Sequence, residues 1–153
     1  MPLDNIDRKI LRELQIDGRI TNTELARRVS LSASPCLARV KRLESEGLIR
    51  HYVALLDPLQ LNLHLNVFIF ISLKTQTRQI LQDFESRVCA YDEVMECYLM
   101  TGDEDYLIRV AITDIGALER FIVERLSPMP EIEKIRSSFA LKQVRYKTAL
   151  PLI

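Results

Sequence analysis

The amino-acid sequence predicts an α+β protein in two parts, a helix-turn-helix followed by a ferredoxin-like βαββαβ unit. Two observations support this prediction. Residues 4–49 carry apolar side chains at helical spacing in three short segments, separated by residues that cap helices. From residue 65 onwards, runs of branched and aromatic residues alternate with helical segments in the order β-α-β-β-α-β. A chain of 153 residues is long enough for two such small domains.

The first helix is expected from Asp4 to Ile16. Asp4 can cap its N-terminus, and Asp7 adds a carboxylate to the first turn, where negative charge favours the helix dipole. The apolar residues recur at helical spacing, namely Ile6, Ile10, Leu11 and Leu14. Gly18 then ends the helix, because glycine tolerates the left-handed conformation common at helix ends.

The second helix is expected to begin after Thr21, because Thr21 and Glu24 have the spacing of a capping box. Three residues of this helix would face the core, namely Leu25, Ala26 and Val29. The small side chain of Ala26 would let the following helix cross closely. Residues 30–32 would form the turn, with Leu31 pointing into the core.

The third helix is expected to be capped by Ser32 or Ser34 and to end at Gly47. Pro35 would lie in its first turn, where the missing amide hydrogen costs nothing. Its apolar stripe consists of Cys36, Val40 and Leu43. The opposite stripe consists of Ser34, Pro35, Ala38, Lys41, Arg42 and Ser45, with Arg39 at its edge.

The second and third helices have the layout of a helix-turn-helix, in which one helix braces another that lies in the DNA major groove. The charge distribution agrees with this interpretation. Residues 1–52 contain 10 Lys/Arg and 7 Asp/Glu, a net charge of +3, whereas residues 53–153 contain 11 and 14, a net charge of −3. Locally positive surface attracts phosphate even when the whole chain is neutral. We therefore expect sequence-specific binding to double-stranded DNA.

Three cations of the third helix, Arg39, Lys41 and Arg42, can contact phosphates or the edge of a guanine. The other predicted DNA-binding residues are Thr21, Ser32, Ser34, Pro35 and Ala38. Hydroxyl groups at helix N-termini can donate to phosphates, although the same groups can serve only as caps. The cations have an alternative role too, as a solvated helix face, and Arg39 could instead bridge to Glu44 or another acid at the rim of the core.

The second part of the chain is expected to begin after residues 50–56, which suggest a strand, and the turn Asp57-Pro58. Its predicted strands are residues 65–73, 94–101, 106–113 and 132–147, and its predicted helices are residues 77–91 and a segment capped by Asp114. The expected domains are thus residues 1–52 and 65–153, joined by a linker of residues 53–64.

The turn of residues 101–105 (Thr-Gly-Asp-Glu-Asp) has two interpretations. Gly and Asp are common in hairpin turns for backbone reasons, so the segment could be purely structural. Alternatively it forms an amino-acid site, in which loop amides and Thr101 hold a carboxylate while Asp103 or Asp105 faces an ammonium group. Three acids in succession are more than a turn requires, which favours the ligand site.

The sequence offers no catalytic or metal site. Cys36, Cys89 and Cys97 are odd in number and lack paired ligand spacing, so we expect buried thiols. His51 and His64 are too far apart to form a pair. No fingerprint of a hydrolase, zinc protease or nucleotide-binding enzyme occurs, so we expect no cofactor and no enzymatic activity. The apolar runs are too short to span a bilayer and no signal peptide precedes the first helix, so a cytoplasmic, nucleoid-associated location is expected, away from membranes.

Several short motifs along nearly the whole chain resemble the Lrp/AsnC family of transcription regulators. They are Leu3-Asp4 with Asp7 and Ile10-Leu11, Leu25-Ala26 with Val29, Leu31-Ser32, Arg39-Val40 with Leu43-Glu44, Gly47-Leu48-Ile49, and Thr101-Gly102-Asp103-x-Asp105-Tyr106-Leu107. The resemblance implies a winged-type helix-turn-helix joined to the effector-binding and assembly domain called RAM. It also implies dimers that join into tetramers, octamers or larger assemblies.

Members of this family often bind an amino acid between dimers, and the resemblance assigns residues to that site. Besides Thr101, these are Gly102, Asp103, Asp105, Ile115 beside Asp114, Ser137, Ser138, Phe139 and Ala140. The leading hypothesis is thus a homo-oligomeric transcription regulator that responds to an amino acid. The alternatives are a ligand-binding or enzymatic ferredoxin-like domain with a helical unit that does not bind DNA, and a nucleoid-organising protein of low specificity.

A dimer is also expected from the predicted sheet itself. Four strands and two helices leave helices for only one face of the sheet. The other face would expose apolar groups, and patches of that size are unusual on monomers. A second copy of the chain is the simplest cover.

Overall fold

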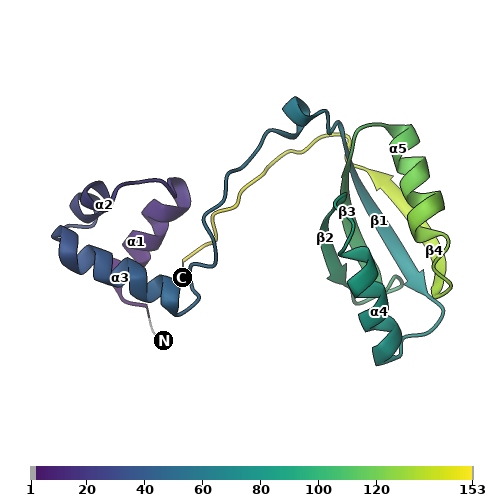
Figure 1. Cartoon of the computed structure of the whole chain (residues 1–153), viewed down its shortest axis with the longest axis horizontal. Helices are drawn as coiled ribbons and strands as arrows, with labels where there is room; N and C mark the ends of the chain where they lie inside the picture. Colours follow the sequence, from purple (N-terminus) through teal and green to yellow (C-terminus); the bar gives the residue numbers. More distant parts are fainter. Residues whose placement is uncertain (1–2, 153) are drawn as a thin grey trace. The chain divides into compact units, whose positions relative to one another are not determined.

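The computed structural model describes residues 3–152 and divides into two compact units (Figure 1). The helical unit consists of the chain up to Leu55 together with the C-terminal segment that begins at Val144, and the sheet unit is Leu56–Gln143. This division differs from the expected one, because the end of the chain belongs to the helical unit rather than to the ferredoxin-like domain. Leu152 packs against the helical core, and the side-chain amide of Gln15 makes two hydrogen bonds with the backbone of Leu150, of 2.6 and 3.2 Å.

The three helices of the helical unit begin where their caps predict. Helix α1 (Asn5–Ile16) has the reciprocal capping box of Asp4 and Asp7, with the Asp7 amide donating to the Asp4 carboxylate over 2.7 Å. Helix α2 (Asn22–Arg28) follows Thr21, and helix α3 (Ala33–Ser45) follows Ser32. Their apolar faces meet in one core of Ile10, Leu11, Leu25, Ala26, Val29, Cys36 and Leu43.

The sheet unit confirms the ferredoxin-like order β-α-β-β-α-β. After a short 3-10 turn, η1 (Pro58–Leu61), it consists of β1 (Leu65–Leu73), α4 (Arg78–Val88), β2 (Val94–Leu99), β3 (Tyr106–Ile112), α5 (Ile115–Arg120) with its π-helical continuation η2 (Phe121–Leu126), and β4 (Ile132–Phe139). The strands lie in the order β2-β3-β1-β4, and neighbouring strands are antiparallel.

Side-chain burial alternates along the strands and shows which face of the sheet is covered. On β1, residues 67, 69, 71 and 73 are buried while the residues between them are half-buried. The buried face packs against side chains of α4, α5 and η2 in one core, which includes Phe84, Leu118 and Phe121. The other face carries Phe68, Phe70 and the paired β3 residue Leu107, none of which is fully buried. The expected uncovered apolar face is therefore present in the single chain.

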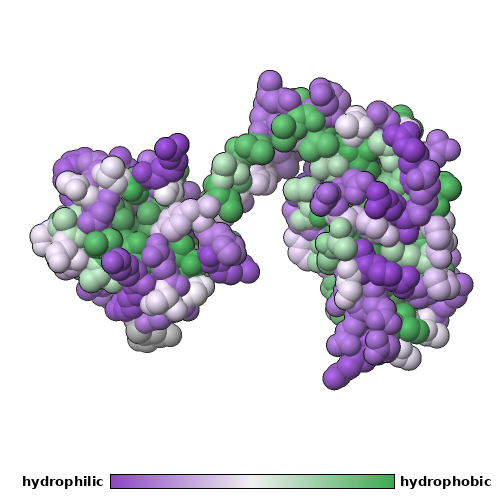
Figure 2. Space-filling model, viewed as in Figure 1, coloured by the Kyte–Doolittle hydropathy of each residue, from purple (hydrophilic) through white to green (hydrophobic). Residues whose placement is uncertain are grey.

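Three expectations about individual segments are wrong. Residues 50–56 form no strand, and Val53, Leu55 and Leu56 are exposed; Figure 2 shows such apolar side chains along the link between α3 and η1. No strand in residues 3–152 pairs with this segment, so it lacks the ladder hydrogen bonds that a strand needs. Strand β4 ends at Phe139 rather than at residue 147. Phe139 pairs with Val67 near the start of β1, and the pairing stops after the Ala140 amide, which donates to the Asn66 carbonyl. Cys89 is exposed rather than buried, since it lies at the end of α4.

Candidate functional site

The turn between α2 and α3 holds the two helices in a fixed arrangement. Ser30 adopts a left-handed backbone conformation, with φ of 60°, and the Leu31 amide donates to the Ala26 carbonyl over 2.8 Å. The side-chain amide of Asn22 donates to the Ala33 carbonyl over 2.8 Å and so joins the start of α2 to the start of α3. Leu31 packs against the helical core, as predicted. The helix-turn-helix is thus built from apolar packing and from backbone contacts within the turn.

Most of the predicted DNA-binding residues lie on the exposed side of this motif. Cys36 and Leu43 face the core, so the opposite stripe of α3 faces solvent. Its exposed members are Ser34, Pro35, Ala38 and Lys41, with Ser32 just before the helix. The Ser32 side chain makes no capping hydrogen bond, so it does not serve as the cap that its position suggests. The Thr21 hydroxyl does cap α2, accepting from the Glu24 amide over 3.3 Å.

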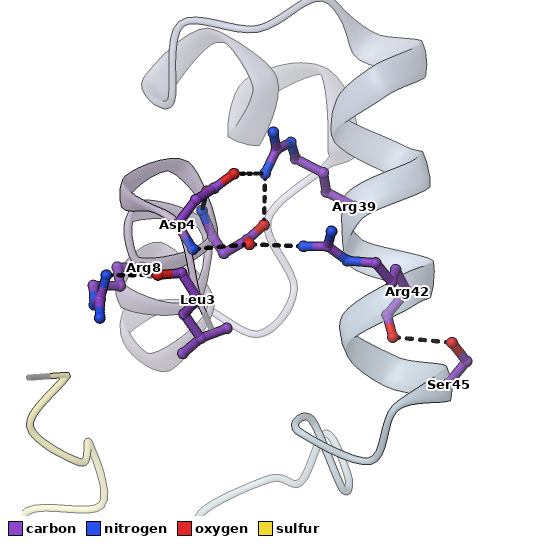
Figure 3. Close-up of polar contacts among 7 residues, drawn as sticks. Leu3, Asp4, Arg8, Arg39, Arg42 and Ser45 are labelled. Carbon is purple, nitrogen blue, oxygen red and sulfur yellow. Dashed lines mark hydrogen bonds and ion pairs between the residues drawn. The ribbon is translucent and has the colours of Figure 1, made fainter. Parts of the chain in front are cut away.

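Arg39 and Arg42 are held by carboxylates of α1 (Figure 3). Nη1 of Arg39 lies 2.6 Å from an oxygen of Asp4 and 2.8 Å from Oδ1 of Asp7, and Nη2 of Arg42 lies 2.7 Å from Oδ2 of Asp7. Asp7 is only 1% exposed. These contacts support the alternative that Arg39 binds an acid at the core rim, although that acid is not Glu44. They also show that Arg39 and Arg42 join α3 to the start of α1, which differs from the alternative of a solvated helix face.

Charge pairing shifts the acid–base properties of this rim. The Asp7 amide and the Arg39 guanidinium lower the pKa of Asp4 to about 2, because both stabilise its charged form. The pKa of Arg39 is raised by its hydrogen bonds to Asp4 and Asp7. The cluster was not predicted from the sequence. The spacing of three residues places Asp4 near Asp7 and Arg39 near Arg42, but it does not show that the two pairs meet.

A second group of charges lies on α2. Glu24 accepts from Arg27 and Arg28 over 2.7 and 2.8 Å, which lowers its pKa to about 2. Arg28 also donates to Glu13 of α1 over 2.8 Å. The Glu24 carboxylate predicted for a capping box is thus engaged by arginines, and the local positive charge of α2 is partly neutralised.

In the sheet unit, Asp105 has a structural role at the predicted effector loop. Its Oδ2 accepts from the Leu73 amide over 2.6 Å, and its Oδ1 accepts from the Gln76 side chain over 2.5 Å. Its backbone amide donates to the Ile71 carbonyl over 3.0 Å. Asp105 thus joins the loop to the end of β1. For Asp105, these contacts favour the purely structural interpretation of the turn.

The other residues of the loop leave more room for a ligand. Thr101, Gly102 and Asp103 are exposed, and Gly102 has φ of 131°, which a residue with a side chain rarely adopts. The intervening Glu104 lies 2.5 Å from Arg136 of β4. Three of the predicted effector residues therefore present their polar groups to solvent.

The remaining predicted effector residues lie between the middle of the sheet and its opposite end. Asp114 caps α5 through the Ala117 amide at 2.8 Å, and the following Ile115 is exposed. Phe139 pairs with Val67, and the Ala140 amide donates to Asn66 near the start of β1. Ser138 and Ser137 lie one and two residues before Phe139 on β4, paired with Phe68 and Ile69 of β1. The loop contacts Leu73, seven residues along β1 from Asn66, which corresponds to about 20 Å along a strand. One sheet unit does not bring the two groups together.

An open depression of about 520 Å³ lies elsewhere on the sheet unit. Its walls come from the end of β1, from α4 and from the start of β4, and they include Lys74, Ile80, Asp83, Arg87, Pro130 and Glu131. None of the predicted effector residues lines it. Lys74 donates to the Pro130 carbonyl over 2.7 Å and Arg87 is paired with Glu131, so both cations already have partners.

Within residues 3–152, no three His, Cys, Asp or Glu side chains lie in an arrangement suited to a metal ion. In the same part of the chain, no helix has both the length and the apolar character that a membrane span requires.

Comparisons with known proteins agree with this geometry. A family model of winged helix-turn-helix DNA-binding domains matches residues 3–50, and a model of the Lrp/AsnC ligand binding domain matches residues 66–150. The chain is similar to a Bkd operon transcriptional regulator of Pseudomonas aeruginosa, with 45% identity over 150 residues covering 98% of each chain. It is also 41% identical to a leucine-responsive regulatory protein of Escherichia coli, over 97% of this chain and 90% of that one.

A solved structure shows the same similarity over both units. It is that of a transcriptional regulator from Neisseria meningitidis in complex with L-Met. Its sequence is 42% identical to this chain, its TM-score is 0.93, and the match covers 98% of this chain and 97% of the other.

Proposed function

The chain belongs to the Lrp/AsnC family of transcriptional regulators, and from this premise we propose that it binds its operators through the exposed stripe of α3 and responds to an amino acid. The orientation of α3 is the observation that supports the proposed binding to operators. Its apolar stripe is buried, so Ser34, Ala38 and Lys41 face outward together. Pro35, Ser32 and Thr21 lie at the start of the same surface, where backbone amides and hydroxyls can meet phosphates.

Lys41 is the cation of this stripe that we place on DNA first. Arg39 and Arg42 lie beside it, but their guanidinium groups are bound to Asp4 and Asp7. We therefore assign them to holding α3 against α1 rather than to the DNA contact. Direct base contacts by α3 give specificity, whereas contacts to phosphate fix position without reading sequence.

The experiment replaces Lys41 with alanine and measures binding to an operator selected from a random duplex library. We expect affinity to fall by about 1–3 kcal/mol if Lys41 contacts a base, with relaxed specificity at that position. The matched control is Lys9→Ala, which removes an exposed lysine from α1 of the same unit. Equal affinities of wild type and Lys41→Ala would remove α3 from the DNA interface. Binding to random and selected duplexes with equal affinity would indicate a low-specificity nucleoid protein instead.

The amino-acid effector is proposed to bind where two copies of the sheet unit meet. Thr101, Gly102 and Asp103 form one group, and Ile115, Phe139 and Ala140 form another at the opposite end of the sheet. A pocket that uses both groups needs each from a different copy. The leucine-responsive relative and the relative solved with L-Met make Leu and Met the first candidates. Asp103 is the acid that we place near the ammonium group, because both oxygens of Asp105 already accept hydrogen bonds.

A thermal-shift screen with the twenty amino acids tests this site. A ligand present at 100 times its Kd should add about 2.7 kcal/mol of stability. Calorimetry with the selected amino acid should then show weaker binding to Asp103→Asn, while DNA binding without ligand is unchanged. If no amino acid stabilises the protein, the effector belongs to another chemical class.

The proposed minimum assembly is a homodimer formed by the uncovered face of the sheet, from which larger species such as octamers could assemble. This face carries Phe68, Phe70, Tyr98 and Leu107, together with the ion pair of Arg109 and Glu96 at 2.7 Å. Light scattering at micromolar concentration should give at least the mass of a dimer, and Phe70→Glu should lower it. As a DNA-binding regulator the protein would act in the cytoplasm, on the nucleoid, and the proposal includes no catalytic step.

A further inference from the structure

Helix α3 carries three cationic side chains within four residues, and they differ in their exposure and in their contacts. Lys41 is exposed, whereas Arg39 and Arg42 are turned toward the acidic N-terminus of α1. Asp4 and Asp7 supply two negative charges against the three positive charges of α3. The local net charge of the cluster is therefore +1 rather than +3.

Asp7 is the centre of this cluster. Its side chain is 2% exposed, and each of its oxygens accepts from a different arginine, at 2.8 and 2.7 Å. Taking a carboxylate out of water is favourable only when charged partners and hydrogen bonds compensate for lost hydration. The buried Asp7 therefore has a strong requirement for both arginines. Asp4 differs, because its side chain is half-exposed and, of the two arginines, it is paired with Arg39.

The arginines themselves are less tightly held. Their side chains are 28% and 37% exposed, and Arg39 reaches both carboxylates through a single amino group. Arg42 binds Asp7 through Nη2, while its buried Nε has no hydrogen-bond partner. Without Asp7, both guanidinium groups could turn toward solvent, next to the surface that carries Lys41.

We propose that Asp7 is a specificity-determining residue, which withholds the guanidinium groups of Arg39 and Arg42 from the DNA backbone and so limits sequence-independent binding by α3. The inference rests on the proposed placement of α3 on DNA. Attraction to phosphate is the same for every sequence, so each additional free cation strengthens non-specific binding. When two of the three cations are neutralised, the contacts made by the exposed stripe contribute a larger share of the binding free energy. The affinity for DNA then depends more on its sequence.

The test is Asp7→Asn in the full chain, measured on a non-specific duplex between 50 and 200 mM salt. Each guanidinium that reaches a phosphate should steepen the slope of log K against log salt by about 0.9. For each such contact the complex should then weaken about 3.5-fold more over this salt range. The ratio of specific to non-specific affinity should fall. A residue that only supported the fold would weaken binding without steepening the slope.

Asp4→Asn is the matched control, because it makes the same change of charge on the same helix while Asp7 still holds both arginines. Its slope should equal that of the wild type. Adding Arg39→Gln and Arg42→Gln to Asp7→Asn should restore the wild-type slope. Equal slopes for Asp7→Asn and Asp4→Asn would overturn the inference.

A second pair of variants keeps the test open if Asp7→Asn does not fold. Lys41→Gln and Arg42→Gln each remove one cation from α3. Lys41→Gln should reduce the slope by about 0.9 per helical unit bound, and Arg42→Gln should leave it unchanged. If both variants reduce the slope equally, the inference fails while the proposed DNA interface stands. If Lys41→Gln has no effect, the placement of α3 on DNA fails, and the inference fails with it.

Discussion

The helical unit and the sheet unit are held together by different means. The helical core has only seven buried apolar residues, and its rim is joined by ion pairs between helices, such as Asp7 with Arg42 and Glu13 with Arg28. The sheet core has fifteen buried residues and a hydrogen-bonded register, and ion pairs of the sheet unit such as Arg109 with Glu96 and Arg136 with Glu104 involve partly exposed side chains. Ion pairs between helices therefore add to a small apolar core in the first unit, whereas a larger apolar core and strand pairing dominate in the second.

The largest expected effect is that of Phe84→Ala in the sheet core. Phe84 is completely buried and its ring lies 4.6 Å from that of Tyr106, so we expect a loss of about 3–5 kcal/mol. Hydrogen exchange resolved by residue measures the stability of each unit separately. Amides of β1, β3 and α4 should lose protection, while those of α1 and α3 should keep theirs.

The matched control is Phe139→Ala, which makes the same change at a side chain that is half-exposed at the end of β4. It should cost much less. An equal loss of protection in the helical unit of Phe84→Ala would show that the two units unfold together and that the comparison does not hold.

The double substitution Arg39→Ala and Arg42→Ala tests the helical unit. It leaves the buried Asp7 carboxylate without either charged partner, which should cost about 3 kcal/mol. This value is at the low end for a broken buried pair, because the cluster lies at the rim and water can reach it. Chemical denaturation combined with exchange of the α1 and α3 amides gives the measurement.

Lys9→Ala and Lys41→Ala together serve as the control for removing two cations from the same unit, since both lysines are exposed. That control should change stability by less than about 0.5 kcal/mol. If the arginine pair is equally neutral, ion pairing does not hold α3 to α1.

Apolar periodicity made most of the fold predictable from the sequence. The strand at residues 65–73 is predicted at the residues where β1 forms, because this run is rich in branched and aromatic residues. Charge partners were not predictable in the same way. Arg39 and Arg42 have the spacing of DNA-reading residues, and nothing within α3 shows that Asp7, more than thirty residues earlier, lies beside them.

The C-terminal segment was mispredicted for a related reason. Its residues have the composition of a strand, but a strand needs a partner, and β1 begins at Leu65, only two residues beyond Val67. The contact of Leu152 with the helical core depends on the path of the chain rather than on a local pattern. Likewise, three acids in one turn suggested a ligand site, whereas one of them, Asp105, completes the backbone hydrogen bonds at the end of β1.

We therefore expect Asp105→Ala to lower the stability of the sheet unit by an intermediate amount. The substitution leaves the Leu73 amide without its acceptor, and an unsatisfied buried donor costs about 1–3 kcal/mol. Thermal unfolding of the free protein should show this loss before any ligand is added. Asp103→Ala, two residues away in the same exposed turn, is the control and should leave stability unchanged. A stable Asp105→Ala variant that binds the effector poorly would return Asp105 to the ligand site.

The smallest expected effect concerns pH and the exposed ion pairs of α2. Arg27 and Arg28 lower the pKa of Glu24 from its ordinary 4.5 to about 2. A carboxyl whose pKa is lower in the folded state stabilises the fold above its unfolded value and loses that contribution as pH falls through the folded value. The contribution of Glu24 should therefore disappear between about pH 4.5 and 2. Because the pair is exposed, salt should weaken it.

Carbon-13 NMR of the Glu24 carboxyl follows this titration directly. In Arg27→Gln with Arg28→Gln the pKa of Glu24 should return toward 4.5, and α2 should no longer gain stability over that pH range. Glu96 of the sheet unit, whose pKa is lowered by Arg109, is the internal reference and should titrate alike in both proteins. An unchanged Glu24 titration in the double variant would show that the helix dipole, rather than the arginines, stabilises its charge.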